Sequence, residues 1–301
     1  MSLLSMLDLG PEDVEKMLGS CGKVKGSPNK FRNSLADRSL AMIFEKPSTR
    51  TRVSFEVAMV ELGGHAVVLN AGELQLGRGE TVADTARILG SYVDCIMARV
   101  RRHETLEELD KHAGVPVING LSDREHPCQV LGDLFTMMEV KGRLEGLKLA
   151  YVGDGNNVCN SLLLGCALCG VDITVASPME YRPKKFFIEK ASKIAGGEST
   201  VSVLENPSEA VSDADIVYTD VWTSMGDEDE REHRKTMFRS YQVDSTLMKR
   251  AKKDAVFMHC LPAHRGEEVT DGVIDSKQSV VWQQAENRLH AQKAVLLREL
   301  K

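Results

Sequence analysis

The chain is organised around one stretch, Phe44-Glu45-Lys46-Pro47-Ser48-Thr49-Arg50-Thr51-Arg52-Val53-Ser54-Phe55-Glu56. The apolar run at residues 40–44 leads into it and predicts a short buried strand. Pro47 stops this strand, because proline cannot donate a ladder hydrogen bond. Ser48 and Thr49 are residue types that begin helices. The stretch is therefore expected to be the point at which a strand passes into a helix.

The expected helix continues through Val53, Val57 and Val60, which are apolar residues at helical spacing, and ends at Gly63-Gly64. Free backbone N–H groups and the positive end of the helix dipole then face outward at residues 48–51, where they favour an anion. Two hydroxyl residues and two arginines at the same place would strengthen a phosphate site. The alternative interpretation is a polar cap with two solvated arginines.

Composition limits the class of protein. A length of 301 residues suggests two domains, and a formal net charge of −6 argues against general nucleic-acid binding while allowing a local basic pocket. The longest apolar run, residues 162–171, contains glycines and is too short to cross a bilayer. Residues 1–10 show no targeting pattern, and the seven cysteines lack a framework spacing. We therefore expect a cytoplasmic protein without a membrane partner.

Strands and helices alternate after an apolar start at residues 3–9 and a short amphipathic helix that Pro11 opens. The expected strands are 40–44, 66–69, 95–100, 115–118, 147–152, 173–176, 201–204, 216–219 and 255–259. The further expected helices are 81–92, 105–112, 126–140, 157–168, 183–194, 208–212, 245–252 and 281–300, with loops at 22–29, 72–80 and 223–234. This alternation predicts an α/β fold with two doubly wound parallel-sheet domains, divided at residues 139–147 and holding the active site in the cleft between them.

Ligand sites of such sheets lie at the carboxyl ends of strands, and polar residues occur there in the first half of the chain. Arg99 lies near the end of one expected strand, and His126-Pro127-Cys128-Gln129 follows the next strand and opens a helix. Taken alone, such an arginine is usually a surface residue, and a histidine near a helix cap is usually structural. Both belong to the same half of the chain as residues 48–52, which allows all three elements to converge on one pocket.

The second half places polar residues after three expected strands. Gly153-Asp154-Gly155-Asn156-Asn157-Val158 is similar to a dinucleotide fingerprint, but Val158 replaces the third glycine and no acidic residue ends the next strand, so nucleotide binding is disfavoured. Asp220-Val221-Trp222-Thr223-Ser224-Met225-Gly226 follows the strand at 216–219, and an acidic residue in a solvated turn is the ordinary interpretation there. His259-Cys260-Leu261-Pro262 ends the strand at 255–259.

The cysteines of this half allow other interpretations. A zinc site at His259-Cys260 is disfavoured, because His264 alone does not complete a ligand set. A Cys–His catalytic pair is disfavoured as well, because adjacent strand residues point to opposite faces. Cys166 and Cys169 form a C-x-x-C without a second pair and with apolar helical flanks, so core packing is preferred over zinc or redox chemistry.

These stretches together resemble the aspartate/ornithine carbamoyltransferase family, whose members bind carbamoyl phosphate. Ser48-Thr49-Arg50-Thr51-Arg52 matches the phosphate signature of the family. His126-Pro127-Cys128-Gln129, with Arg99 upstream, matches its His-Pro-x-Gln motif. Residues 75–80 are similar to its phosphate-site loop, which a neighbouring subunit of a trimer supplies, and Arg288 matches its remaining phosphate-site arginine. Without the resemblance, Arg288 would be taken as a solvated helix residue.

The resemblance is to the ornithine carbamoyltransferases in particular. Their Gly-Asp-Gly-Asn-Asn stretch supplies a substrate-binding asparagine, here Asn157, and their Asp-x-x-x-Ser-Met-Gly loop, here starting at Asp220, recognises ornithine. Their His-Cys-Leu-Pro motif is also present, whereas aspartate carbamoyltransferases have proline in place of Cys260. The chain also lacks the dicarboxylate-binding arginine pattern of the aspartate enzymes. Thr81 stands where many relatives have serine, and it keeps the hydroxyl.

The resemblance implies transfer of a carbamoyl group from carbamoyl phosphate to the δ-amine of L-ornithine, giving L-citrulline and phosphate. It implies a homotrimer or a multiple of trimers, with no metal, no organic cofactor and no nucleic-acid partner. Residues 1–140, with the helix at 281–301 packing back on them, would bind carbamoyl phosphate, and residues 147–280 would bind ornithine. The leaving phosphate can accept the proton of the amine, since no residue is an obvious strong general base.

The residues that the resemblance implies fall into three sets. Carbamoyl phosphate would be bound by Ser48, Thr49, Arg50, Thr51, Gln75 of a neighbouring subunit, Arg99, His126, Pro127, Cys128, Gln129, Cys260, Leu261 and Arg288. Ornithine would be bound by Asn157, Asp220, Ser224 and Met225. The catalytic set would be Arg50, Arg99, His126, Gln129, Asp220 and Cys260.

Two alternatives to this function stay open. One is a carbamoyltransferase for another amine, such as putrescine or a modified ornithine, which the Ser-Met-Gly sequence disfavours. The other is a non-catalytic binding protein on the same scaffold. Intact Arg50, Arg99, His126 and Cys260 disfavour it.

Overall fold

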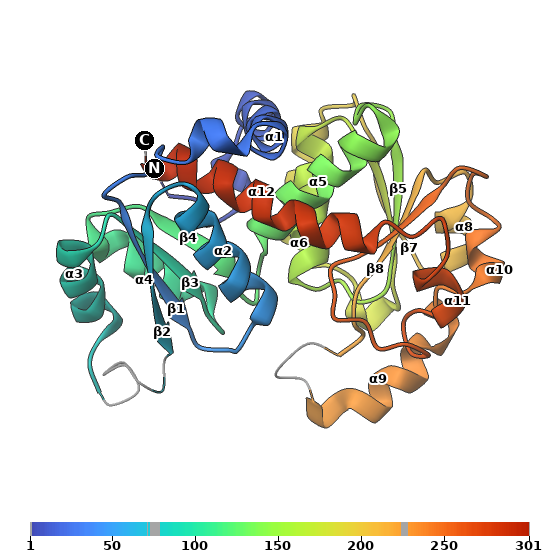
Figure 1. The fold of residues 1–301 in the computed structure, drawn as a ribbon. Helices are drawn as coiled ribbons and strands as arrows, with labels where there is room; N and C mark the ends of the chain where they lie inside the picture. Colours follow the sequence, from blue (N-terminus) through green and yellow to red (C-terminus); the bar gives the residue numbers. More distant parts are fainter. Residues whose placement is uncertain (1, 71, 73–78, 224–227, 301) are drawn as a thin grey trace. The chain divides into compact units, whose positions relative to one another are not determined.

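The computed structural model describes residues 2–70, 72, 79–223 and 228–300. The chain divides into a first unit, Met1–Phe135 with Asn287–Lys301, and a second unit, Thr136–Glu286 (Figure 1). Both divisions fall inside long helices, α5 (Pro127–Lys141) and α12 (Val281–Leu300). Each unit is built on one parallel sheet, so the predicted α/β class with two parallel-sheet domains is confirmed.

The sheet of the first unit has the strand order β2-β1-β3-β4, and every pair is parallel. Its strands are β1 (Ser39–Phe44), β2 (His65–Asn70), β3 (Cys95–Arg99) and β4 (Val117–Leu121). The helices wholly inside this unit are α1 (Pro11–Gly26), α2 (Thr49–Glu61), α3 (Val82–Tyr92) and α4 (His103–Ala113), with 3₁₀ turns η1 (Met6–Asp8) and η2 (Pro28–Phe31). The order reverses between β1 and β3, which places a topological switch point at their carboxyl ends.

The alternation of side chains along β1 explains why the first sheet is covered on both faces. Ala41 and Ile43 pack in a buried cluster that includes Ala86 of α3 and Leu106 of α4. Leu40 and Met42 are equally buried, and they must lie on the other face because successive strand residues alternate. A strand buried on both faces is typical of a parallel sheet flanked by helices.

The sheet of the second unit has the order β7-β6-β5-β8-β9, again parallel throughout. Its strands are β5 (Lys148–Val152), β6 (Asp172–Ala176), β7 (Val201–Leu204), β8 (Ile216–Thr219) and β9 (Val256–His259). Its helices are α6 (Asn157–Leu168), α7 (Lys185–Ala195), α8 (Pro207–Val211), α9 (Arg231–Phe238), α10 (Ser245–Met248) and α11 (Asp271–Ile274), with 3₁₀ turns η4 (Met179–Tyr181), η5 (Glu228–Glu230) and η6 (Arg239–Tyr241). Here the order reverses between β5 and β8.

The core of the second unit also lies on both faces of its sheet. Ala150 and Val152 of β5 belong to a buried cluster with Phe238 of α9. Tyr151, between them in the strand, points to the other face and stacks on Tyr218 of β8 with a centroid distance of 5.8 Å. No helix in the described part of the chain is long and apolar enough to cross a bilayer.

Helix α2 begins where the sequence predicts, and its buried face is not the one that carries the valines. Ser48 is its N-cap, and the Ser48 hydroxyl accepts a hydrogen bond from Thr51 N at 3.3 Å. The side chains of Val53 and Val60 are 52% and 65% exposed, so the spacing of the valines does not mark the core. The buried face carries Phe55 with Ala58 and Met59. The larger Phe55 and Met59 side chains bury more apolar area than the valines, which favours this face.

Several element boundaries differ from the expected ones. Helix α1 continues through the predicted loop to Gly26, because burial of Cys21 and Val24 outweighs the cost of glycine, about 1 kcal/mol per residue. The predicted charged loop at 223–234 contains η5 and the start of α9, which buried Phe238 anchors to the core. Strand β4 lies later than predicted, α10 is shorter, and α11 had no prediction. Most of the predicted loop at 72–80 lies outside the described residues.

Two glycine-to-alanine substitutions test the packing of the first unit. A Cβ at Gly90 of α3 would lie 1.8 Å from the carbonyl oxygen of Ala113, whereas a Cβ at Gly19 of α1 would meet nothing within 4 Å. We expect Gly90→Ala to lower the free energy of unfolding by about 2 kcal/mol or more through overpacking. Gly19→Ala is the matched control and should raise it by about 0.5–1 kcal/mol. Urea titrations in which both variants shift the midpoint in the same direction would contradict this packing.

Candidate active site

The polar residues of the first unit meet at the carboxyl end of its sheet. Phe44 and Arg99 end β1 and β3, and they are register partners at the switch point. Helix α2 starts shortly after β1, so its first turn lies at the same edge. Arg99 is buried, which excludes the ordinary interpretation of a surface arginine. The predicted position of Arg99 at a strand end is confirmed.

Arg288 reaches this edge from α12. Its Nη2 donates a hydrogen bond to Thr51 Oγ1 in the first turn of α2 at 2.9 Å, and both residues are buried. Helix α12 passes close to α5 at Gly132, where a Cβ would lie 3.4 Å from the Arg288 Cα. The structure therefore brings two residues together that the sequence separates by more than two hundred positions. We refer to Thr51, Arg99, His126 and Arg288 as the cationic cluster.

His126 belongs to this cluster and is held as a neutral imidazole. It immediately precedes α5, and its carbonyl accepts hydrogen bonds from Gln129 N at 3.1 Å and Val130 N at 3.3 Å. Burial holds the pKa of His126 well below its ordinary value, and the nearby charges of Arg288 and Arg99 lower this pKa further. Because protonation would add a third buried cation, His126 can donate a hydrogen bond without carrying a charge.

Gln129 is buried one turn into α5, and its orientation is fixed by a residue that the sequence analysis missed. Its Nε2 donates to Asp133 Oδ1 at 2.8 Å. A carboxylate can only accept from the amide NH₂ group, so the Gln129 oxygen must face the other way. The sequence signal was present, since positions i and i+4 face each other on a helix.

The remaining residues of the His-Pro-x-Gln motif lie in the first turn of α5, and their role in binding carbamoyl phosphate stays a prediction. Pro127 is the first residue of α5. The Cys128 side chain is fully buried, and its Sγ donates to Asn119 O at 3.5 Å. Burial raises the pKa of Cys128 to about 12, so its thiol stays protonated near neutral pH. Gln75 lies outside the described residues.

A second cluster forms at the switch point of the second unit. Asp220 directly follows β8, and Asn156 follows the turn after β5. Asp220 Oδ1 accepts hydrogen bonds from Val221 N at 2.8 Å and from Cys260 Sγ at 2.9 Å. Asp220 Oδ2 accepts one from Asn156 Nδ2 at 2.8 Å. Asn156, Asp220 and Cys260 are the carboxylate cluster of this unit, and three separate sequence motifs contribute to it.

Asn156 in this cluster is not the asparagine that the sequence analysis selected. Its Oδ1 caps α6 by accepting hydrogen bonds from Val158 N at 3.0 Å and Cys159 N at 3.1 Å. The Oδ1 of Asn157 lies 3.0 Å from Val158 N. The motif identified the turn, but only the fold distinguishes the two neighbouring side chains. The role of Asn157 in binding ornithine stays a prediction.

Arg234 of α9 connects two of the motifs beneath this cluster. Its Nη1 donates to Asp154 Oδ2 and to Trp222 O, both at 3.0 Å, and its guanidinium carbon lies 4.6 Å from the Tyr181 ring centroid. The sequence predicts a charged loop at 223–234, and Arg234 at its end was given no role. Ser224 and Met225 follow this anchored segment and lie outside the described residues.

His259 supports the turn that carries Cys260. Its Nδ1 accepts a hydrogen bond from Leu261 N at 2.8 Å, so its Nε2 carries the proton and donates to Glu268 Oε1 at 3.0 Å. Both side chains of the His259–Glu268 pair are fully buried. Each ring nitrogen therefore has a partner, and the imidazole has no lone pair to activate a thiol.

The expectation that His259 and Cys260 point to opposite faces is wrong. Strand β9 ends at His259, and Leu261 adopts a φ of 56°, so the chain has left the strand geometry at Cys260. As a result, ligand atoms of Asp220, His259 and Cys260 all lie within 4.8 Å of one another.

The C-x-x-C pair belongs to the helical core of the second unit. Cys166 is fully buried in α6, and Cys169, which caps that helix, donates its N–H to Cys166 O at 3.1 Å. Burial raises the pKa of the Cys169 thiol to about 12. These surroundings agree with core packing, the interpretation that the sequence favoured.

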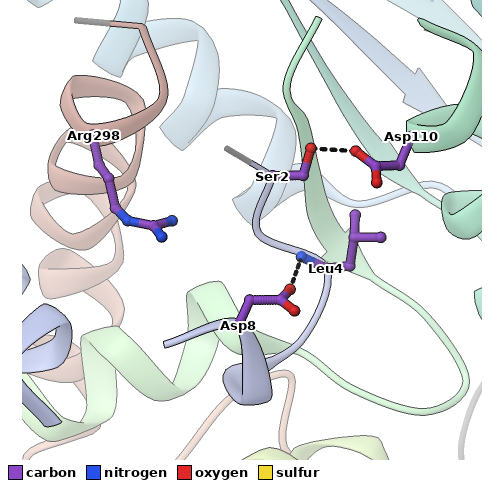
Figure 2. A pocket seen from close by; sticks show the side chains of 5 residues that line it. All are labelled: Ser2, Leu4, Asp8, Asp110 and Arg298. Carbon is purple, nitrogen blue, oxygen red and sulfur yellow. Dashed lines mark hydrogen bonds between the residues drawn. The ribbon is translucent and has the colours of Figure 1, made fainter. Parts of the chain in front are cut away.

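The first unit also has a surface cavity of about 280 Å³, shown in Figure 2. It is lined by Ser2, Leu4, Asp8, Asp110 and Arg298. Ser2 Oγ donates to Asp110, and Leu4 N donates to Asp8 Oδ2 at 2.8 Å. None of these residues belongs to the cationic cluster, and the two carboxylates are largely satisfied by the chain itself.

Comparison with known proteins assigns both units to one family. Residues 1–139 match the family model for the aspartate/ornithine carbamoyltransferase carbamoyl-P binding domain, and residues 145–298 match that for the Asp/Orn binding domain. The chain is 55% identical over 300 residues to the ornithine carbamoyltransferase of Methanoculleus marisnigri, covering 98% of this chain and 95% of that protein. It is 56% identical to the anabolic ornithine carbamoyltransferase of Pyrococcus furiosus, covering 98% and 94%.

Solved structures give the same assignment. The ornithine carbamoyltransferase of Pyrococcus furiosus superposes with a TM-score of 0.94 at 56% identity, covering 98% of this chain and 95% of that chain. The anabolic enzyme of Campylobacter jejuni superposes with a TM-score of 0.94 at 42% identity, covering 100% and 99%. The chain therefore belongs to the aspartate/ornithine carbamoyltransferase family, and the resemblance found in its sequence motifs is confirmed.

The buried state of His126 predicts a pH dependence of stability. Because the folded-state pKa of His126 is lowered, the unfolded chain takes up a proton below about pH 6.5 that the folded chain does not. This group should therefore reduce stability as the pH falls below that value, by at most about 1.4 kcal/mol per pH unit. In His126→Gln, unfolding free energies measured by urea titration from pH 7.5 to 5 should decline less steeply. The exposed His65→Gln is the control, and equal slopes in wild type and His126→Gln would contradict the assignment.

Proposed function

We propose that this chain transfers the carbamoyl group of carbamoyl phosphate to the δ-amine of L-ornithine, giving L-citrulline and phosphate. The observation that carries the proposal is the hydrogen bond of 2.9 Å between Cys260 and Asp220, which joins the two motifs typical of ornithine enzymes. Identities of 55% and 56% to ornithine carbamoyltransferases over nearly the whole chain support it. The first unit binds carbamoyl phosphate, and the second unit binds ornithine.

The start of α2 is the phosphate site in this proposal. Ser48, Thr49, Arg50 and Thr51 offer backbone N–H groups, hydroxyls and a guanidinium at a helix N-terminus, where the dipole favours an anion. Arg288 is already bonded to Thr51 in this turn, so its positive charge lies beside the helix start. A dianionic phosphate would compensate the positive charge that the unit buries here.

The remaining members of the cationic cluster act on the carbamoyl group. Together with Arg50, Arg99 and neutral His126 donate hydrogen bonds to the carbamoyl oxygen, on which negative charge grows as the amine attacks. Gln129 accepts from the carbamoyl NH₂ group with the oxygen that its bond to Asp133 directs away from that carboxylate. These donors stabilise the transition state more than the substrate, which is the requirement for catalysis.

The carboxylate cluster recognises ornithine. Asp220 pairs with the α-ammonium group, while Asn157, Ser224 and the Met225 backbone hold the rest of the head group. Cys260 and Asp220 guide the δ-amine. Putrescine lacks the α-amino-acid head group, so it would lose these contacts.

The chemical step uses no metal or organic cofactor in this proposal. The δ-amine forms a bond to the carbamoyl carbon, the bond from that carbon to the phosphate oxygen breaks, and the leaving phosphate takes up the amine proton. At a pKa of about 10.4 only about one amine in a thousand is neutral near pH 7.4. The site must therefore select or create the neutral form.

We assign the protein to the cytoplasm and to a homotrimer or a multiple of trimers. All seven cysteines lie in the described part of the chain and none of them forms a disulfide there, which fits a reducing compartment. Val53 and Val60 leave an exposed apolar stripe on α2, beside the proposed phosphate site, and a neighbouring chain could cover it. In this assembly Gln75 of one chain completes the phosphate site of the next.

A colorimetric citrulline assay tests the function directly. Purified protein is supplied with carbamoyl phosphate and, in parallel, with L-ornithine, putrescine, N-acetylornithine or aspartate. The proposal requires carbamoylation of ornithine to have the highest kcat/KM. A preference for another amine would reassign the substrate, and no turnover together with tight carbamoyl phosphate binding would indicate a binding protein.

Asp220→Asn should weaken the use of ornithine specifically. Removing one partner of a largely desolvated charge pair costs about 2–5 kcal/mol, so we expect kcat/KM for ornithine to fall by about thirtyfold or more. Calorimetric affinity for carbamoyl phosphate should stay nearly constant. Asp172→Asn is the matched control, because this strand residue accepts a hydrogen bond from Thr200 N at 2.7 Å outside the cluster. An equal loss of carbamoyl phosphate affinity in Asp220→Asn would contradict the assignment.

A site shared between chains predicts complementation. Arg50→Ala should lower kcat by about a hundredfold to a thousandfold, as expected for losing a transition-state donor, and Gln75→Ala homotrimers should also be impaired. In an equal random mixture, about a quarter of the sites would be intact. These sites take Arg50 from a Gln75→Ala chain and Gln75 from a neighbouring Arg50→Ala chain. Turnover should therefore recover when the two variants are mixed under reversible dissociation. If hybrid trimers are shown to form but turnover does not recover, Gln75 acts in the site of its own chain or in no site.

A further inference from the structure

We propose that Asn156 is a positioning residue that fixes the orientation of the Asp220 carboxylate and so selects the oxygen that receives the ornithine ammonium. This inference rests on the proposed function. The Asn156 amide nitrogen lies 2.8 Å from Asp220 Oδ2, and it is the side chain of the Gly-Asp-Gly-Asn-Asn turn that the structure places on that carboxylate.

The Asn156 amide can adopt only one orientation at this site. Its Oδ1 accepts hydrogen bonds from Val158 N at 3.0 Å and Cys159 N at 3.1 Å, and Tyr151 Oη lies 3.4 Å away. The two backbone N–H groups can only donate, so a flipped amide would place its NH₂ group against them. The helix cap therefore forces Nδ2 toward Asp220.

The backbone holds the capping residue in place. Gly155 N donates to Tyr181 O at 2.8 Å, and Asn156 N donates to Asp154 O at 2.8 Å. A Cβ at Gly155 would lie 2.1 Å from Pro183 N, so the turn can approach this segment only with glycine. Asn156 is consequently presented by a rigid turn, which is the requirement for a side chain that orients another.

The contacts of Asp220 show which of its two carboxylate oxygens can accept from the substrate ammonium. Oδ1 already accepts from Val221 N and from Cys260 Sγ, which is about the capacity of one carboxylate oxygen. Within the described part of the chain, Oδ2 accepts from Asn156 and retains capacity for another donor. We infer that the substrate ammonium binds Oδ2 beside the Asn156 amide.

Without the Asn156 donor the orientation of the Asp220 carboxylate is no longer fixed. The terminal torsion of an aspartate is broad and roughly two-fold, so the carboxylate could turn and exchange the roles of its two oxygens. The thiol of Cys260 would then lose a fixed acceptor. Asn156 acts through Asp220 and touches no reacting atom, and its effect should therefore appear chiefly in the KM for ornithine.

Isosteric replacement separates orientation from helix capping. Asn156→Asp keeps an oxygen that caps α6 but replaces the donor to Asp220 with a second carboxylate oxygen. We expect kcat/KM for ornithine to fall about ten- to hundredfold, the range for losing a hydrogen bond to a charged group. This fall should come mainly from a higher KM for ornithine, and the affinity for carbamoyl phosphate should stay unchanged. Asn206→Asp is the matched control, since Asn206 caps α8 through Ser208 N at 2.9 Å and should leave kinetics unaltered.

A purely structural role of Asn156 predicts a different result for the Asn156→Asp variant. If Asn156 only caps α6, Asn156→Asp should be harmless, because aspartate is as good an N-cap as asparagine. Ornithine kinetics within twofold of wild type in a folded Asn156→Asp would therefore overturn the proposal. If that variant does not fold, Asn156→Ser decides, since it keeps a capping oxygen and lacks the amide. We expect it to lower kcat/KM for ornithine about tenfold, and an unchanged value would overturn the proposal as well.

A double-mutant cycle shows whether Asn156 acts through Asp220. Asn156→Ser should have little further effect on the KM for ornithine in the Asp220→Asn background, because the residue that it orients is no longer charged. Additive losses would overturn the proposal. A wild type that does not use ornithine would instead contradict the proposed function, and it would be recognised before any variant is compared.

Discussion

Both clusters depend on one constraint of parallel sheets, namely that neighbouring strands whose connections leave in opposite directions open a gap at their carboxyl ends. β1 lies beside β3 in the first unit, and β5 lies beside β8 in the second. Arg99 ends β3, and Asp220 directly follows β8. Neither residue would be near its partners if the strand order did not reverse at these two places.

The two units use opposite electrostatics at equivalent positions. The cationic cluster gathers Arg99 and Arg288 near the imidazole of His126, whose pKa is lowered first by burial and further by their two charges. The carboxylate cluster surrounds one acidic group with neutral donors, an amide, a thiol and a backbone N–H. One unit is thereby suited to a phosphate and the other to an ammonium group. A reaction between an anionic donor and a cationic acceptor needs this division of charge.

The sequence predicts the elements better than it predicts their contacts. Helix α6 and strand β8 lie at the predicted residues, because caps and apolar periodicity are local signals. The valine spacing of α2 indicates a helix but not its buried face, since two apolar stripes fit the same helix and only packing chooses between them. Asn156, which holds the Asp220 carboxylate, could not be selected, because its partner lies 64 positions away in the sequence.

The division of the chain at α5 and α12 has a consequence for synthesis. The second unit is continuous, whereas the first takes its final segment, residues 287–301, from beyond the whole of the second. A ribosome therefore adds every residue of the second unit before it reaches Arg288 and Lys293, which bond to Thr51 and Glu61 of α2. Domains generally fold as units, so the first unit can be completed only after the second, although most of its residues are made first.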